Sequence, residues 1–295
     1  MSEQGVIGQG VDQVPVGAQA SGARAKGEPV LVADHVTKQF RVAGGHLTAV
    51  DDVSVAFHEG RVLAVVGESG SGKSTLARML LRLMPVTNGT ITYRGHDITH
   101  IKGADLRRYW REVQAVFQDP FASFNQFFTV GHTLRRSLHS ADLEGGSADE
   151  LIERCLGYVG LKPEDTLYKY AHQLSGGQRQ RVMIARALMM NPKVLLADEA
   201  TSMLDASLRV SVLNVLQDLR RDLGLTVLFI THDIGQACYL ADEVVVMEHG
   251  KVVEHGTTDE VIFDPKDAYT KRLLADVPNL KGSLKARQDG FMPVD

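Results

Sequence analysis

The segment GESGSGKST, residues 67–75, constrains the fold of this chain more than any other part of the sequence. It matches the pattern G-x-x-x-x-G-K-[ST], in which glycines allow backbone N–H groups to close around phosphates. An apolar run, residues 61–66 (RVLAVV), precedes it, and a helical pattern begins near Lys73. Such a run indicates a strand that is buried on both faces of a parallel sheet. The succession of strand, loop and helix makes a chance Gly-Ser turn the weaker interpretation.

This loop predicts a binding site for a nucleotide and a metal ion. Lys73 is expected to reach the β- and γ-phosphates, and Ser74 is expected to offer its hydroxyl to Mg²⁺. The predicted nucleotide-binding residues of the loop are Gly67, Ser69, Gly70, Ser71, Gly72, Lys73, Ser74 and Thr75.

A second apolar run, at residues 194–197, ends in two carboxylates in the sequence VLLADEA. Asp198 is expected to hold the Mg²⁺ shell, and Glu199 to orient or deprotonate an attacking water. Paired acids can also belong to a solvated turn or a helix cap, but the apolar residues before them favour a buried strand tip. Residues 225–233 (LTVLFITHD) are likewise an apolar run that ends in polar residues. The carboxyl ends of parallel strands are where open α/β sheets bind ligands.

Other segments predict the parts built around this sheet. Short β-prone runs separated by Gly and Asn turns indicate an antiparallel layer. Between residue 119 and about residue 183 helical signals replace strand signals, and Ser147 with Glu150 forms a capping box. The expected fold class is therefore α/β, with a P-loop NTPase (RecA-like) core, an antiparallel β subdomain and an inserted helical subdomain. The β-prone runs are residues 30–40, 48–57 and 89–95.

The two ends of the chain differ from its middle in composition. Residues 1–28 are rich in Gly, Ala and Gln and lack the apolar block of a secretory signal, so we expect a mobile tail. The folded domain is expected to span residues 29–263. Residues 264–295 are expected to form a short extension, helical at first and polar at its end.

Composition limits the classes of partner. Lys and Arg together number 32 and Asp and Glu 36, so the net charge of −4 gives no sign of a nucleic-acid surface. The two cysteines lack CxxC spacing, which fits a reducing, cytosolic compartment. No apolar run approaches the about 18 residues of a membrane span. We expect a soluble protein whose membrane contacts are made through other chains.

A further glycine-bearing segment, LSGGQRQR at residues 174–181, suits an anion held at a helix start. The P-loop, LSGGQ and LLADEA, in this order and spacing, resemble the ATP-binding cassette ATPases. The resemblance covers residues 30–274 and implies transport-coupled ATP hydrolysis with ATP and Mg²⁺ as cofactors.

The resemblance also implies roles for positions outside these motifs. Gln118 in VFQDP is similar to the Q-loop glutamine, which contacts Mg²⁺ and water, and Asp205 to the D-loop aspartate. His232 is similar to the switch histidine that contacts the γ-phosphate, although a lone histidine there would usually be structural. Phe40 occupies the position of the aromatic residue that stacks on adenine, where Tyr is more common, and its alternative role is a core residue.

In the resembled family two cassettes pack head to tail, so each signature covers the nucleotide of the other. Ser175, Gly176, Gly177 and Gln178 would then bind the γ-phosphate of ATP held by a second cassette, identical or paralogous. The other implied partners are membrane permease subunits and, indirectly, a solute-binding protein. The implied location is the cytoplasmic face of the membrane, as a peripheral subunit.

Aromatic residues gather around the Q-loop. They fit a groove for a coupling helix of the permease, and their alternative role is the core of the helical subdomain. These residues are Phe117, Phe121, Phe124, Phe127 and Phe128.

Four segments are similar to the ATPase subunits of oligopeptide and dipeptide importers. Oligosaccharide and nickel importers of the same architecture are alternatives; exporter-linked cassettes and soluble cassettes linked to nucleic acids fit less well. Ala200 replaces the usual Pro and Met203 the usual Ala, which weakens the assignment of a particular solute. The segments are VGESGSGKSTLAR, FQDPFASFNQ, LSGGQRQRVMIARAL and DPKDAYTKRLL, the last containing Pro265, Tyr269, Thr270 and Leu273.

Overall fold

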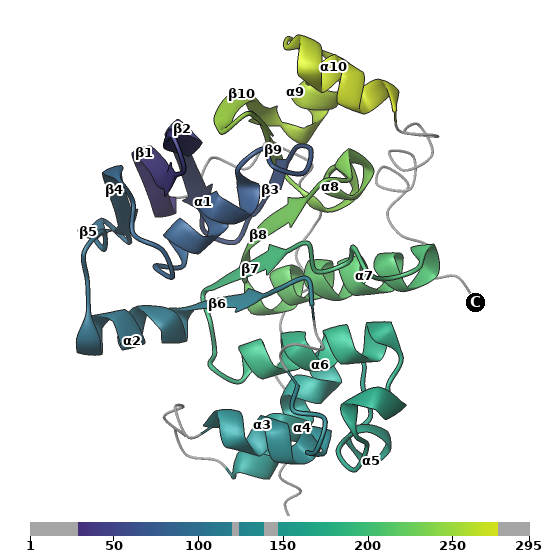
Figure 1. The fold of residues 1–295 in the computed structure, drawn as a ribbon. Coiled ribbons are helices and arrows are strands. Elements are labelled where there is room, and N and C mark those ends of the chain that lie inside the picture. Colours follow the sequence, from purple (N-terminus) through teal and green to yellow (C-terminus); the bar gives the residue numbers. More distant parts are fainter. Residues whose placement is uncertain (1–28, 120–123, 139–146, 277–295) are drawn as a thin grey trace, which may run out of the picture.

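The computed structural model describes residues 29–119, 124–138 and 147–276, and these form two sheets with helices between and below them (Figure 1). The tail predicted at residues 1–28, Phe121 and the end of the predicted C-terminal extension lie outside the described residues.

The central sheet has six strands in the order β10-β9-β3-β8-β7-β6. Its first five strands in sequence order run parallel, and β10 pairs antiparallel with β9. Every residue of β3, β7 and β8 is buried, which explains why the corresponding sequence runs are continuously apolar. The strands are β3 (Val62–Val66), β6 (Val113–Val116), β7 (Val194–Asp198), β8 (Thr226–Thr231), β9 (Glu243–Glu248) and β10 (Lys251–Thr257).

The two faces of this sheet belong to different apolar cores. Val62, Ala64 and Val66 of β3 face one core, whereas Leu63 and Val65 face the other, because successive strand side chains point to opposite sides. The first core contains the helical subdomain and two helices, α7 (Ala206–Leu223) and α8 (Ile234–Leu240). The second contains the antiparallel sheet and α1 (Lys73–Leu80).

The antiparallel sheet has the strand order β2-β1-β4-β5 and confirms the predicted antiparallel layer. The sequence did not indicate α2 (Gly103–Glu112), which connects this sheet to β6. The four strands are β1 (Pro29–Val42), β2 (Gly45–His58), β4 (Asn88–Tyr93) and β5 (His96–Asp97).

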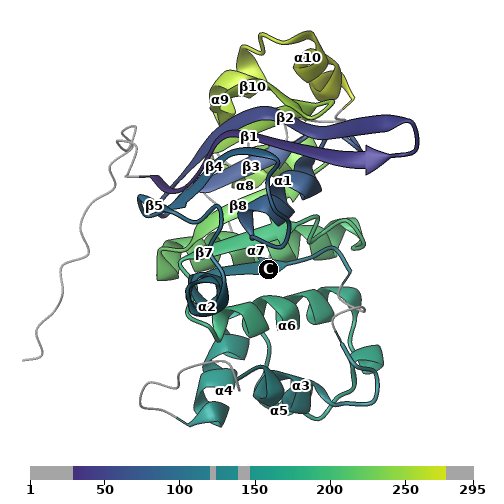
Figure 2. The same ribbon diagram turned by 60° about the vertical axis from the view of Figure 1, so that its left-hand side comes forward.

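The inserted helical subdomain lies on the opposite side of the central sheet from α1 (Figures 1 and 2). Ser147 and Glu150 form the predicted capping box at the start of α4, with the Glu150 N–H donating to Ser147 Oγ at 3.1 Å. The last helix continues to Leu188, beyond the expected boundary near residue 183. The helices are α3 (Val130–Ser137), α4 (Ala148–Tyr158), α5 (Pro163–Thr166), the 3₁₀ helix η2 (Ala171–Gln173) and α6 (Gly176–Leu188).

Two short helices, α9 (Thr258–Phe263) and α10 (Ala268–Ala275), follow the last strand and lie beside β10 in Figure 1. The fold class expected from the sequence is confirmed by this arrangement. Within the described ranges, no helix is both long enough and apolar enough to cross a lipid bilayer.

Candidate functional site

The P-loop passes so close to neighbouring backbone that two of its glycines have no substitute. Gly67 and Gly72 have φ angles of +151° and +102°, which other residues rarely adopt. A Cβ atom on Gly67 would lie 2.2 Å from the Met247 carbonyl oxygen, and one on Gly72 would lie 2.4 Å from that of Ala49. The loop is therefore fixed between β9 and β2.

The helix that follows the loop begins without a side-chain cap. Its N-cap residue Gly72 offers no acceptor to the first-turn N–H groups, which suits an anion bound there. Lys73 is 4% exposed, and its Nζ donates to the carbonyl oxygens of Gly67 and Glu68, both at 2.7 Å. Burial lowers the pKa of Lys73, and the nearby carboxylates of Glu199 and Asp198 oppose that shift.

Ser74 and Asp198 meet from positions far apart in the sequence. Ser74 Oγ donates to Asp198 Oδ1 at 3.1 Å, where α1 begins and β7 ends. Burial raises the pKa of Asp198, and the hydrogen bond from Ser74 works against that rise. A hydroxyl and a carboxylate are hard oxygen ligands of the kind that Mg²⁺ takes alongside phosphate oxygens, so this pair fits that ion.

Glu199 and His232 lie at the ends of adjacent strands. Glu199 has φ of +49°, and its N–H donates to the Ile230 carbonyl oxygen at 2.9 Å, which holds this uncommon conformation in place. His232 Nδ1 lies 3.5 Å from Glu199 Oε1. The Glu199 side chain is 19% exposed and that of His232 is 56% exposed, so the carboxylate is the more sheltered of the two groups.

Two further contacts, which the sequence did not indicate, tie the segments around Glu199 and His232 together. Thr201 Oγ1 lies 2.5 Å from Gln236 Oε1, and Gln236 Nε2 donates to Asp233 Oδ2 at 2.9 Å. Asp233 also caps α8. The Asp233–Gln236 contact is local to the start of α8, whereas no local pattern marks the Thr201–Gln236 contact, because it joins residues that are 35 positions apart.

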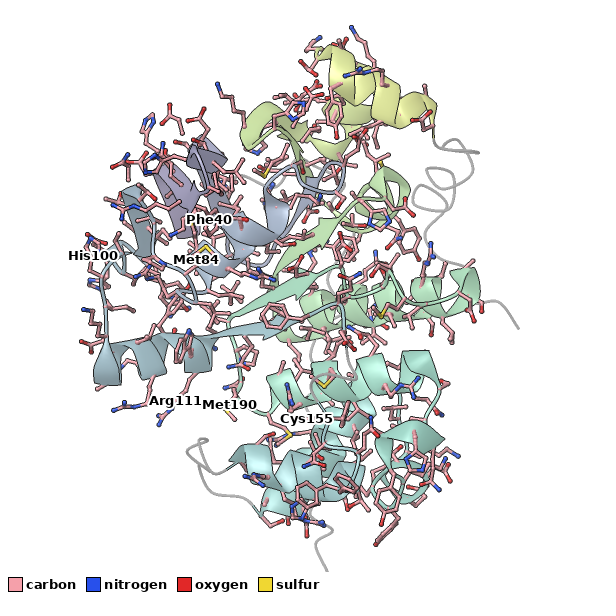
Figure 3. The ribbon with its side chains drawn as sticks, in the orientation of Figure 1. Phe40, Met84, His100, Arg111, Cys155 and Met190 are labelled. Atoms are coloured by element: carbon pink, nitrogen blue, oxygen red, sulfur yellow. The ribbon has the colours of Figure 1, made fainter. Side chains whose placement is uncertain are left out.

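Gln118 follows β6, whose last residue Val116 pairs with Ala197 of β7. It is exposed and lies at the same sheet edge as Asp198. Phe40 lies on β1 opposite Leu47 and is half-buried, with Lys38 Nζ 5.3 Å from its ring centroid (Figure 3). Since one part of the ring remains accessible, Phe40 is not a pure core residue, and its contact with adenine stays a prediction.

The signature segment also has a structural role within its own chain, which was not predicted from the sequence. Ser175 is the N-cap of α6 and accepts the Gln178 N–H at 3.2 Å, while Gln178 Oε1 accepts the Ser175 N–H at 3.0 Å. These two residues form a capping box, for which the spacing of Ser and Gln was a readable signal. Ser175 is exposed to solvent.

The signature glycines pack on residues around Asp205. A Cβ on Gly176 would lie 3.1 Å from Leu204 Cδ2, and one on Gly177 would lie 3.1 Å from Leu208 Cδ2. Asp205 is exposed and caps α7 by accepting the Leu208 N–H at 3.0 Å. The signature and the D-loop segment therefore form one continuous unit.

The structure separates this unit from the P-loop. Helix α1 packs in one apolar core through Leu76 and Met79, and α6 packs in the other through Val182 and Ile184, on opposite sides of the sheet (Figure 1). Among the described residues, no hydrogen bond or ion pair joins residues 67–75 to residues 175–178. The chain thus brings together Lys73, Ser74, Asp198, Glu199 and His232, with Gln118 at the same sheet edge, but it does not bring Ser175–Gln178 to them.

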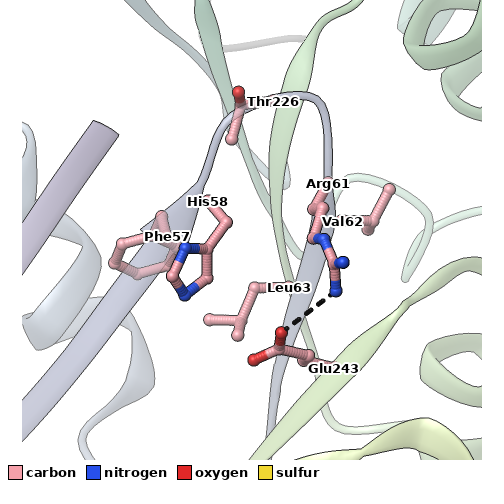
Figure 4. Close-up of a pocket in the computed structure, with 7 residues that line it drawn as sticks. All are labelled: Phe57, His58, Arg61, Val62, Leu63, Thr226 and Glu243. Atoms are coloured by element: carbon pink, nitrogen blue, oxygen red, sulfur yellow. Dashed lines mark hydrogen bonds and ion pairs between the residues drawn. The ribbon is translucent and has the colours of Figure 1, made fainter. Parts of the chain in front are cut away.

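Two of the hollows on the described surface differ in their relation to the P-loop. The larger, a groove of about 600 Å³ between α7, α8 and α10, is lined by His232 and by Glu68 of the P-loop. A much smaller cavity lies where β3 begins, remote from the P-loop, and there Arg61 Nη1 is 3.4 Å from the buried Glu243 Oε1 (Figure 4). It lacks phosphate-binding geometry and is not the candidate site.

The family model described as ABC transporter matches residues 50–202, which include the P-loop, the signature and both carboxylates. The chain belongs to the ABC transporter family. A protein of Brucella ovis named for peptide import and ATP binding is 40% identical over 254 residues, covering 85% of this chain and 79% of the relative. Glutathione import ATP-binding protein GsiA of Salmonella paratyphi A is 40% identical over 86% of this chain and 42% of its own length.

Solved ABC cassettes have the same fold. MJ0796, described as a dimeric ATP-binding cassette in a post-hydrolysis state with ADP and Pi, has a TM-score of 0.69 and 27% identity, over 77% of this chain and 98% of that chain. CbiO1 of Clostridium perfringens, part of the ABC transporter complex cbiONQ, has a TM-score of 0.72 and 25% identity, over 87% and 99%. The predictions of the family, the fold class and an ATP-hydrolysing transport ATPase are confirmed.

Proposed function

We propose that this ABC ATPase is the motor of an importer, working as one of two cassettes packed head to tail beneath separate permease subunits. The observation that carries the proposal is the division of the molecule. The P-loop, the Ser74–Asp198 pair and the Glu199–His232 pair meet at one sheet edge, whereas the signature, whose Ser175 is exposed, lies with the other core. A second chain would have to supply the missing signature.

The nucleotide site would be held by the loop and its neighbours. The uncapped start of α1 and the Lys73 ammonium would bind the phosphates, and Phe40 would stack on adenine. Ser74, Asp198 and Gln118 are the oxygen ligands available to Mg²⁺, which would neutralise phosphate charge when bound. The other expected contacts are made by Gly67, Ser69, Gly70, Ser71, Gly72 and Thr75.

Hydrolysis would use the carboxylate beside the exposed histidine. Glu199 accepts a proton from the water as its oxygen attacks the γ-phosphorus, and the bond to the bridging oxygen of ADP breaks. His232, 3.5 Å from Glu199, would donate a hydrogen bond to the γ-phosphate and orient that carboxylate. The products are ADP and phosphate.

The second cassette would complete the site with its own Ser175, Gly176, Gly177 and Gln178, with Asp205 beside them. Ser175 is exposed in one chain, and the similar cassette MJ0796 is described as dimeric. The positive end of the α6 dipole and the small residues at its start would then face the γ-phosphate of the other chain.

The permease would dock on the aromatic surface near the Q-loop. Phe124 is buried and belongs to the core, the alternative role given for these residues, whereas Phe127 is 86% exposed and Tyr168 is 82% exposed. The two segments lie together, because the Val130 N–H donates to the Lys169 carbonyl oxygen at 2.8 Å. We assign Phe127 and Tyr168 to a docking surface for a permease helix, on the cytoplasmic face of the membrane.

Peptide is the proposed solute, because relatives named for peptide and glutathione import match most of this chain. The test is ATP-driven uptake into vesicles that hold this ATPase, its permeases and its solute-binding protein. Labelled peptides should accumulate, and the Glu199→Gln variant should abolish accumulation. Accumulation of oligosaccharide or Ni²⁺ without peptide would replace the solute, and ATP-driven efflux would contradict import.

A further inference from the structure

The C-terminal helix α10 contacts the P-loop directly. The Tyr269 hydroxyl accepts the backbone N–H of Glu68 at 2.8 Å, across 201 residues of sequence. Tyr269 is 4% exposed, so this hydrogen bond is shielded from water. Burial also raises the pKa of Tyr269, which keeps its hydroxyl neutral.

The same stretch of backbone is held from its other side. Lys73 Nζ donates to the Glu68 carbonyl oxygen at 2.7 Å, so the peptide units before and after Glu68 are both fixed. The Glu68 and Gly70 positions are themselves exposed, at the open part of the loop. One fixing contact comes from within the P-loop motif, and the other comes from an element outside the matched residues 50–202.

Three contacts anchor α10 to the sheet edge beside the P-loop. The Glu254 carboxylate of β10 accepts the N–H groups of Lys266 and Asp267 at 2.7 and 3.2 Å. Arg272 pairs with Glu248 of β9 at 3.3 Å and lies 5.6 Å from the Tyr269 ring centroid. Tyr269 is thus held rigidly, as an acceptor that is to position another group must be.

We propose that Tyr269 is a positioning residue for nucleotide binding. Its hydroxyl fixes the Glu68 peptide, and the loop thereby keeps the shape in which Lys73 and the loop N–H groups meet the phosphates. The C-terminal extension is then part of the nucleotide site rather than an appendage. The inference rests on the proposed role of the P-loop as the phosphate-binding element.

The test is ATP affinity in the full chain carrying Tyr269→Phe, which keeps the ring and removes the acceptor. Loss of one buried hydrogen bond predicts a Kd for ATP about three- to tenfold higher, with KM raised equally and kcat within about twofold. Tyr239→Phe is the matched control, because its hydroxyl donates to Asn214 Oδ1 at 2.6 Å and not to the loop. This control should leave the Kd unchanged.

A second variant separates positioning from general docking of α10. Arg272→Ala removes the ion pair with Glu248 but keeps the Tyr269 hydroxyl, so its Kd should stay closer to the wild-type value at an equal loss of Tm. Equal rises in Kd for both variants at equal Tm, or a wild-type Kd in Tyr269→Phe, would overturn the proposal. Lys73→Ala, measured in parallel, tests the P-loop itself: if it binds ATP normally, the proposed function fails as well.

Discussion

Two helix starts in this molecule carry glycines and suit phosphate, yet they are built in opposite ways. At α1 the N-cap is Gly72, no side chain caps the helix, and the buried Lys73 lies beside it. At α6 the exposed Ser175 and the half-buried Gln178 cap each other. The first lies beside a buried ammonium, the Ser74–Asp198 pair and the Glu199–His232 pair, whereas the second has Gly176 and Gly177 at its first positions. The difference fits the proposal that the first helix start binds the nucleotide of its own chain and that the second completes the site of another chain.

The largest expected effect is on the rate of ATP hydrolysis at the α1 helix start. Glu199→Gln keeps the size of the side chain and removes the proton acceptor, so ATP hydrolysis should fall about 10²- to 10⁴-fold while ATP binding persists. Phosphate release and nucleotide affinity measure the two quantities. Glu68→Gln, which alters another carboxylate near Lys73, should keep near-normal hydrolysis. Normal turnover in Glu199→Gln would show that another group is the base.

Lys73→Ala should have the next largest effect. Removing a buried charged donor from the phosphate site predicts ATP affinity about 10- to 100-fold weaker, measured by titration with a fluorescent nucleotide. Lys251→Ala, which alters an exposed lysine paired with Asp51 at 3.3 Å, serves as the control. Unchanged affinity in Lys73→Ala would remove the distinction between the two helix starts.

Replacing one glycine near each helix start by alanine compares how the two segments tolerate a larger side chain. Gly67→Ala places a Cβ 2.2 Å from a backbone oxygen, so the free energy of unfolding should fall by about 3 kcal/mol or more. Gly177→Ala meets the movable side chain of Leu208 at 3.1 Å, and alanine favours helix, so stability should change by less than about 1 kcal/mol. Chemical unfolding measures both. Gly177→Ala should instead impair ATP-dependent pairing of cassettes; equal destabilisation by both variants would contradict this difference.

Asp198→Asn should give the smallest effect, which is a change in the free energy of unfolding. Burial raises the pKa of Asp198 in the folded state above the 3.8 expected for the unfolded chain. Between the unfolded and the folded pKa, the folded state therefore binds more protons than the unfolded chain. The free energy of unfolding therefore falls as pH rises through that window, and the asparagine variant should be the more stable protein at neutral pH. Urea unfolding from pH 4 to 8 tests this, with Asp205→Asn as a control that keeps a helix cap. A less stable Asp198→Asn at neutral pH would contradict the assignment.

The sequence predicted those features that depend on local patterns. The strand, loop and helix around Lys73, the strand ending at Asp198 and the cap at Ser147 each have a short-range signature. The contacts of Tyr269 with Glu68 and of Thr201 with Gln236 have none, because each depends on how distant elements pack. For the same reason the capping of Ser175 by Gln178 was readable, whereas the packing of Gly177 on Leu208 was not.

The central claim is that the signature of one chain meets the nucleotide of another. The most direct test is the rate of maleimide labelling of Ser175→Cys in the Glu199→Gln background, with and without ATP. The native cysteines, Cys155 and Cys238, are buried, and burial raises the pKa of Cys155 to about 11, so the new thiol is the reactive one. We predict fast labelling without ATP and protection by ATP that increases with subunit concentration. Protection that is independent of concentration, or no protection at all, would contradict the account.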